Sequence, residues 1–104
     1  MSSTPGRPEG SEKDFQRSVI RLATLCGWLT YHTHDSRGSS PGFPDLVLVR
    51  DRVIFAELKT TKGRLGQHQL DWLARLREAG AETYLWRPAH WTQIQRVLSR
   101  RRDA

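Results

Sequence analysis

The chain has 104 residues, 37% of them hydrophobic and 27% charged, a composition typical of one soluble globular domain. Lysine and arginine outnumber the acidic residues by 17 to 11, and the net charge of +6 favours a polyanionic partner such as nucleic acid. No apolar stretch is long enough to cross a bilayer, and the polar, proline-containing N-terminus lacks the apolar segment of a secretory signal. The single cysteine, Cys26, can form no internal disulfide, which suits a reducing compartment, so we expect a cytoplasmic protein.

The N-terminal part of the chain has the pattern of an amphipathic helix. Ser11 and Asp14 are spaced as a capping box, and apolar residues then recur at helical spacing. We therefore predict a helix from about Glu12 to Cys26. Because Glu12 stands three residues before the apolar Phe15, the spacing places it at the N-terminal end of the buried stripe.

The rest of the chain alternates between strand and helix patterns. Strands are predicted at residues 28–34, 46–49, 53–59 and 82–86, and helices at residues 67–80 and from Pro88 onward. The order αβββαβα, in which the last strand is reached through a helix, indicates an α/β fold with a small mixed sheet flanked by helices. We expect a disordered tail at 1–10, one domain at 11–99 and a short basic tail at 100–104.

Three charged residues interrupt the two central strands, which are otherwise apolar. Asp45 precedes the first strand, and Glu57 and Lys59 share one face of the second because side chains alternate along a strand. A three-residue turn from Arg50 to Arg52 sets Asp45 opposite Glu57, whereas a two-residue turn without a bulge places Asp45 on the other face. We expect the three-residue turn or an equivalent bulge.

This arrangement of charges favours a metal ion. Two converging carboxylates cannot both stay ionised cheaply unless a positive charge compensates them. Oxygen ligands without a cysteine or histidine cluster favour Mg²⁺ or Mn²⁺ over zinc. Such a cation polarises phosphoryl oxygens and supplies hydroxide, and Lys59 beside it can contact a scissile phosphate or hold the attacking water. These groups suit phosphodiester hydrolysis.

The motif Pro44-Asp45, eleven residues, then Glu57-Leu58-Lys59 resembles that of the PD-(D/E)xK nuclease superfamily. From about Ser11 to Leu98 the chain resembles the VRR-NUC family more closely, through Glu12, Gly42-Phe43-Pro44-Asp45, Glu57-Leu58-Lys59, and Gln69 followed by Trp72 and Leu73. The resemblance implies a restriction-endonuclease-like fold. It also implies a metal-dependent DNA endonuclease that acts as a homodimer on branched DNA such as Holliday junctions, in the cytoplasm of a bacterium or of a phage-infected host cell.

The resemblance also assigns roles to individual residues. The implied ligands of Mg²⁺ or Mn²⁺ are Asp45, Glu57, the backbone carbonyl of Leu58 and, directly or through a water, Glu12. Lys59 would be the catalytic lysine, and Gln69 would orient Lys59 or the water. Where the family often has Ser or Thr before the second long helix this chain has Gly66, so the capping of that helix stays open.

Several basic and imidazole side chains are candidates for DNA contacts. We expect His32 and His34 to line the cleft beside Asp45 and touch the DNA backbone, unless they are half-exposed strand residues. A zinc site at this histidine pair would need a further ligand that the sequence does not define. Arg37, Lys62 and Arg64 would flank the metal site and hold phosphates, although ordinary loop solvation explains them equally well.

Other interpretations remain open. Asp45 could be a turn residue, Glu57 and Lys59 a solvated pair on an edge strand, Glu12 a first-turn acid and Gln69 a buried amide. The rival function is a non-catalytic nucleic-acid-binding module of the same fold, and an RNA nuclease is not separable from a DNA nuclease. Core packing or a dimer interface is expected, before base stacking, for Trp28, Trp72, Trp86 and Trp91. Candidates for that interface are Val19, Leu25, Trp28 and the final helix.

Overall fold

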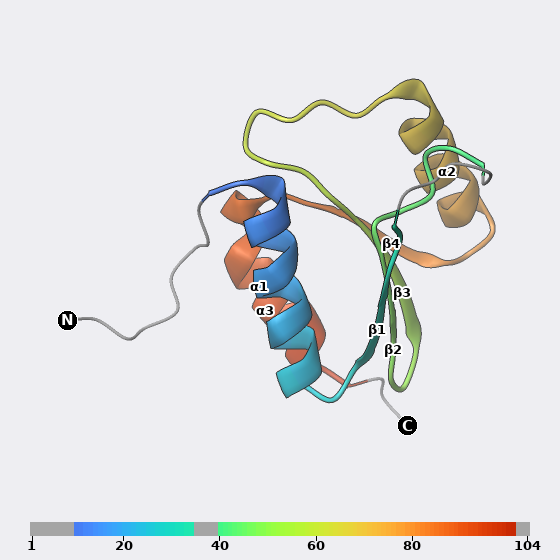
Figure 1. Ribbon diagram of the computed structural model, residues 1–104. Helices are drawn as coiled ribbons and strands as arrows, with labels where there is room; N and C mark the ends of the chain where they lie inside the picture. Colours follow the sequence, from blue (N-terminus) through green and yellow to red (C-terminus); the bar gives the residue numbers. More distant parts are fainter. Residues whose placement is uncertain (1–9, 35–39, 102–104) are drawn as a thin grey trace.

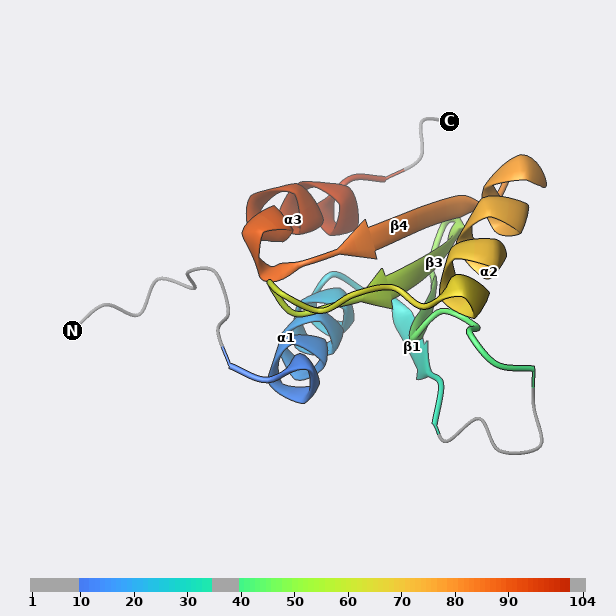
Figure 2. The same cartoon turned by 90° about the horizontal axis from the view of Figure 1, so that it is seen from above.

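The computed structural model describes residues 10–34 and 40–101 and contains one four-stranded sheet between two helical layers. The elements are α1 (Glu12–Leu25), β1 (Leu29–His32), β2 (Leu46–Val49), β3 (Val53–Leu58), α2 (Gln67–Glu78), β4 (Glu82–Trp86), a 3₁₀ turn (Pro88–His90) and α3 (Trp91–Ser99). Helices α1 and α3 cover one face of the sheet, and α2 lies against the other (Figures 1 and 2). The predicted element order and the α/β class are confirmed. The expected N-terminal tail, apart from Gly10, lies outside the described residues.

The sheet is mixed, with strand order β1-β2-β3-β4. The pairs β1–β2 and β2–β3 are antiparallel, whereas β4 runs parallel to β3 because α2 carries the chain back to the starting end of the sheet. Strand β3 is therefore central, and Glu57 near its end is only 1% exposed. The alternative that Glu57 and Lys59 form a solvated edge-strand pair is wrong.

The register of the β2–β3 hairpin decides which face carries Asp45. Val49 pairs with Val53 and Leu46 with Ala56, so the turn has the three residues expected from the sequence. One step beyond the last pair, Asp45 faces Glu57. The odd-numbered side chains of both strands therefore point toward the α2 side of the sheet.

The core occupies the opposite face of the sheet, under α1 and α3. The sheet contributes even-numbered side chains that are 0% exposed: Leu46, Leu48, Ile54, Ala56 and Leu58. The helices contribute Phe15, Val19, Ala23, Ile94, Val97 and Leu98. Each fully buried large aliphatic side chain stabilises the fold by about 1.5–3 kcal/mol, so this face fixes the strand register.

The hairpin turn packs against the ends of two helices instead of being a simple solvated loop. The guanidinium carbon of Arg50 lies 4.4 Å from the centroid of the Trp28 ring, and that of Arg52 lies 5.0 Å from it. Arg50 Nη1 also donates to the carbonyl oxygens of Cys26 at 2.8 Å and Leu98 at 3.0 Å. These contacts satisfy carbonyls at the C-terminal ends of α1 and α3 and hold the turn in place.

Helix α1 begins as predicted, but its first turn departs from the expected burial. Ser11 Oγ accepts from the Asp14 amide at 3.1 Å, and Asp14 Oδ2 accepts from the Ser11 amide at 3.3 Å, which confirms the capping box. Glu12 is exposed, so the expectation that it lies on the buried stripe is wrong. Side chains lean toward the N-terminus of a helix, and a first-turn residue therefore extends beyond the core that Phe15 enters.

Two of the residues expected at a dimer interface belong to the core. Val19 is 0% exposed and Trp28 is 3% exposed, whereas Leu25 is 77% exposed. In the part of the chain that the structure describes, no helix is both long and apolar enough to cross a membrane.

Candidate active site

Asp45, Glu57 and Lys59 come together at the end of the hairpin that lies away from its turn. Asp45 Oδ2 accepts the backbone N–H of Leu58 at 2.9 Å. Lys59 Nζ lies 4.0 Å from Glu57 Oε2, and the Lys59 side chain is 14% exposed. Two acids and one amine therefore share one side of the sheet, as the three-residue turn requires.

Asp45 is held by the end of β1. The Thr33 amide donates to the Asp45 carbonyl at 2.8 Å, and the Thr33 hydroxyl donates to the Pro44 carbonyl at 2.8 Å. Pro44 itself is fully buried. These two bonds extend the β1–β2 pairing past its last strand residue and fix the backbone from which the Asp45 carboxylate projects.

The turn before Asp45 docks closely on α2. Gly42 has φ +90°, and a Cβ at this position would lie 2.5 Å from the backbone carbonyl carbon of His68. Trp72, one helical turn after His68, donates its Nε1–H to the Pro41 carbonyl at 3.1 Å. The glycine is therefore required both by the backbone conformation and by the close approach of the two segments.

Gln69 links the start of α2 to the acid pair. Its Nε2 donates to Glu57 Oε2 at 2.7 Å, and its Oε1 accepts from the Gly66 amide at 2.8 Å. Gly66 has no side chain for capping, so Gln69 supplies the side-chain hydrogen bond at this helix start. The structure pairs Gln69 with Glu57 and not with Lys59; a role in orienting water stays a prediction.

The surroundings of Asp45 and Glu57 disfavour a negative charge on both carboxyl groups at once. Burial, followed by the nearby charge of Asp45, raises the pKa of Glu57 to about 8, and Lys59 opposes the rise. Burial also raises the pKa of Asp45, against the lowering effects of the Leu58 N–H and of Lys59. Glu57 Oε1 is buried and has no hydrogen-bond partner among the described residues.

These observations fit a hard divalent cation. The unpartnered Glu57 Oε1 and the Asp45 carboxylate offer oxygen ligands, and a dication would remove the cost of ionising both acids. The described residues contain no group of three or more His, Cys, Asp or Glu side chains placed to hold a metal. The Leu58 carbonyl and the exposed Glu12 therefore stay predicted ligands, with water filling the remaining positions.

The histidine pair gives no support to a zinc site. The rings of His32 and His34 have centroids 4.1 Å apart, but no further acid or thiol joins them within the described ranges. His34 lines the cavity beside Asp45, as expected, whereas His32 is half-buried and is not among the lining residues. Their contact with DNA stays a prediction.

The predicted phosphate-contacting cations lie on the segment between β3 and α2, with one exception. Lys62 and Arg64 are exposed there, and Arg37 lies outside the described residues. Arg87 Nη1 holds this segment by donating to the carbonyls of Thr60 at 2.6 Å and Gly63 at 2.7 Å. No local sequence pattern indicates this role of Arg87, because the two carbonyls lie more than twenty residues away in the chain.

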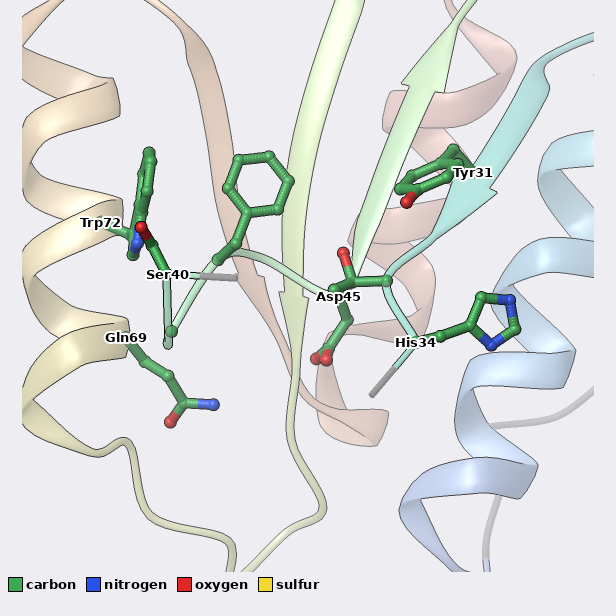
Figure 3. Close-up of a pocket in the computed structure, with 9 residues that line it drawn as sticks. Tyr31, His34, Ser40, Asp45, Gln69 and Trp72 are labelled. Atoms are coloured by element: carbon green, nitrogen blue, oxygen red, sulfur yellow. The ribbon is translucent and has the colours of Figure 1, made fainter. Parts of the chain in front are cut away.

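A cavity of about 380 Å³ opens beside the acid pair, between β1 and α2 (Figure 3). Its lining residues are Tyr31, Thr33, His34, Ser40, Gly42, Phe43, Asp45, Gln69 and Trp72. Trp72 was expected in the core or at a dimer interface, whereas the structure places it in this wall. Trp28, Trp86 and Trp91 are buried in the core as expected.

A buried glutamate opposite a half-buried aspartate, with a neighbouring lysine, at the end of a mixed sheet, is the arrangement of a PD-(D/E)xK nuclease domain. The VRR-NUC domain family model matches residues 9–89, and the chain belongs to this family. Two solved structures share its fold. One, described as a "VRR_NUC domain", has a TM-score of 0.69 and 22% identity and covers 86% of this chain and 96% of its own. The other, a "VRR_NUC domain protein", has a TM-score of 0.70 and 15% identity and covers 92% of this chain and 95% of its own. No protein with a curated function matches the chain at a significant level.

The raised pKa of Glu57 predicts how stability depends on pH in the absence of divalent cations. Between its ordinary value of 4.5 and about 8, the folded protein keeps a proton that the unfolded chain has lost. The free energy of unfolding must therefore fall as pH rises through this range. We expect Glu57→Gln to remove most of this fall and to exceed wild type in stability at pH 8 by on the order of 2 kcal/mol. Urea unfolding in chelator at pH 5 to 8 measures both effects.

The matched control is Glu78→Gln, which neutralises an exposed acid of α2 and should follow the wild-type curve. Addition of Mg²⁺ should stabilise wild type at pH 8 and leave Glu57→Gln nearly unchanged. Parallel curves for wild type and Glu57→Gln would show that this carboxyl is not the titrating group.

The docking of the turn on α2 predicts a selective effect of Gly42→Ala. Gly42 and Gly80 have φ values of +90° and +89°, but a Cβ at Gly80 would meet nothing within 4 Å. Both alanine variants should lose about 1 kcal/mol of stability from backbone strain. Only Gly42→Ala must push the turn from α2 and displace Asp45, so it alone should weaken Mn²⁺ binding, by roughly tenfold. Calorimetric Mn²⁺ titration of the two variants makes the comparison, and equal affinities would exclude a positioning role for Gly42.

Proposed function

We propose that the protein is a Mg²⁺- or Mn²⁺-dependent endodeoxyribonuclease. The observation that carries this proposal is the buried Glu57 carboxylate, with one unpartnered oxygen, opposite Asp45 and 4.0 Å from Lys59 Nζ. Burying Glu57 beside a second carboxylate costs stability, and groups with pKa values raised in this way cluster at functional sites. Membership of the VRR-NUC family supports nuclease chemistry on DNA.

Each residue of the site has a distinct task in this proposal. Asp45, Glu57 and the Leu58 carbonyl hold the cation, and Glu12 joins them directly or through a water. The bound cation would supply Lewis-acid stabilisation of the phosphate and an activated water. Lys59 neutralises charge on the scissile phosphate or holds the attacking water, and it needs no proton transfer to do so. Gln69 keeps the Glu57 carboxylate oriented through its 2.7 Å hydrogen bond.

The same site argues against a module that only binds nucleic acid. Such a module gains affinity from cations and loses it from carboxylates placed near phosphate. Here two acids converge. Lys59 and Gln69 contact Glu57, and the Leu58 N–H donates to Asp45. We further propose branched DNA such as Holliday junctions as the substrate and the cytoplasm of a bacterium or a phage-infected host cell as the location.

Cleavage assays test the catalytic proposal. Supercoiled plasmid and a four-way junction are incubated with Mg²⁺, Mn²⁺ or chelator. We expect metal-dependent nicking, with the junction cut faster than a linear duplex of the same sequence. Asp45→Asn and Lys59→Ala should each lower kcat by about 100-fold or more, because each removes a group that stabilises charge in the transition state.

Glu78→Gln removes an exposed acid remote from the hairpin and serves as the control, with activity equal to wild type. Metal-dependent nicking that persists unchanged in Asp45→Asn and Lys59→Ala would remove these residues from the mechanism. DNA binding without any nicking in either metal would favour the non-catalytic module.

We also propose that the protein is a homodimer. The register aligns Leu29, Val49 and Val53 in one row across three strands, at the turn end of the sheet. Their exposed fractions are 76%, 39% and 43%. This apolar row lies on the α2 side of the sheet but stays exposed at the turn end, which is typical of a surface that a partner buries. A second copy placed there leaves the acid pair at the opposite end of the strands accessible to DNA.

The mass in solution tests the dimer. Light scattering after size exclusion should give twice the chain mass of 12.0 kDa for wild type. Val49→Lys places a charge in the middle of the row and should give a single chain mass with an unchanged circular dichroism spectrum. A monomeric wild type would refute the dimer, and a dimeric Val49→Lys would place the interface elsewhere.

A further inference from the structure

The cavity beside Asp45 is suited to a neutral, flat group and not to a phosphate. Among the described residues that line it, Asp45 is the only acid and none is a lysine or arginine. The exposed cations Lys62 and Arg64 lie on the segment that follows Lys59, outside the cavity lining. A phosphate would therefore meet like charge in the cavity and opposite charge outside it.

One wall of the cavity is a preformed aromatic cluster. The Phe43 and Trp72 ring centroids are 5.1 Å apart at an interplanar angle of 85°. Phe43 also packs edge-on against Phe55, with centroids 6.1 Å apart. The hydrogen bond from Trp72 Nε1 to Pro41 fixes the indole further. This wall is held in place by the protein itself, so a ligand does not have to order it.

Tyr31 faces this wall from the other side of the cavity, with Asp45 between them (Figure 3). It lies on the edge strand β1 and is 61% exposed, so it contributes little to the core. A large aromatic side chain at an exposed edge is available for contact with a ligand.

We propose that this cavity binds one unstacked nucleobase of the DNA strand whose phosphate lies at the Asp45–Glu57 pair. This inference rests on the proposed nuclease function and deepens it. Aromatic side chains stack on any base, so the site should not distinguish base identity. It should distinguish paired from unpaired nucleotides, because extracting a base from a duplex costs a few kcal/mol that an unpaired nucleotide does not pay. Selectivity for branched DNA would then arise partly within a single chain.

Steady-state cleavage of a duplex with one unpaired nucleotide tests the proposal. An otherwise identical duplex carries an abasic residue at that position. For wild type we expect KM to be about tenfold higher with the abasic substrate, while kcat changes little. Tyr31→Ala should raise KM for the intact substrate by a similar factor and abolish the difference between the two substrates. Tyr31→Phe, which keeps the ring, should behave as wild type.

Leu70→Ala is the matched control, since Leu70 is 45% exposed on α2 and does not line the cavity. It should keep the wild-type difference between the two substrates. Equal KM values for both substrates in wild type would overturn the proposal. A difference in KM between the intact and abasic substrates that persists in Tyr31→Ala would also overturn the proposal.

A binding measurement separates this inference from the nuclease assignment. Lys59→Ala is titrated, in Mg²⁺, into the same duplex with 2-aminopurine as the unpaired base. Stacking in the cavity should quench the fluorescence, and Lys59→Ala/Tyr31→Ala should not quench it. A wild-type enzyme that cleaves while its Lys59→Ala variant shows no quenching refutes the nucleobase site alone. Quenching that depends on Tyr31, in a protein that cleaves nothing, refutes the nuclease and keeps the site.

Discussion

The site depends on one constraint, the antiparallel register that sets Asp45 opposite Glu57. Because side chains alternate, a slip of one residue would carry every odd-numbered side chain of β2 to the other face. The apolar face under α1 and α3 prevents the slip, since Leu46 and Leu48 would have to leave the core. Arg50 adds a second restraint at the turn by donating to the carbonyls of Cys26 and Leu98. Ordinary core packing on one face therefore aligns the charged groups on the other.

The free-energy cost of burying Glu57 beside Asp45 falls at the end of a central, well-packed strand. Glu57 stands at the end of the central strand, 1% exposed, with a pKa raised to about 8 by burial and by Asp45. Its neighbours offset this cost only in part, because Gln69 donates to one oxygen and the other has no partner among the described residues. A conflict between local chemistry and global stability is typical of functional sites, and here it coincides with the VRR-NUC motif.

Much of this arrangement could be predicted from the sequence, for identifiable reasons. The helix and strand order follows from strong periodicity and from the Ser11 capping box, and the acid pair follows from counting residues around a turn. The prediction that Glu12 lies on the buried stripe is wrong because periodicity identifies the buried face of a helix but not where the core ends along the helix axis. The contacts of Arg50 and Arg87 join segments far apart in the chain, and no local pattern signals them.

Trp72 shows how one residue can serve both fold and function. The sequence predicts core packing or a dimer interface for it, whereas in the structure its indole N–H donates to the Pro41 carbonyl and docks the Gly42 turn on α2. The same ring forms the wall of the cavity beside Asp45, so the contact that positions the acid also shapes the space next to it. Movement of this turn would displace the Asp45 carboxylate and change the shape of the cavity together. One short segment therefore couples the two, and in the function proposed above this coupling would hold the phosphate at the acid pair in a fixed relation to a nucleotide in the cavity.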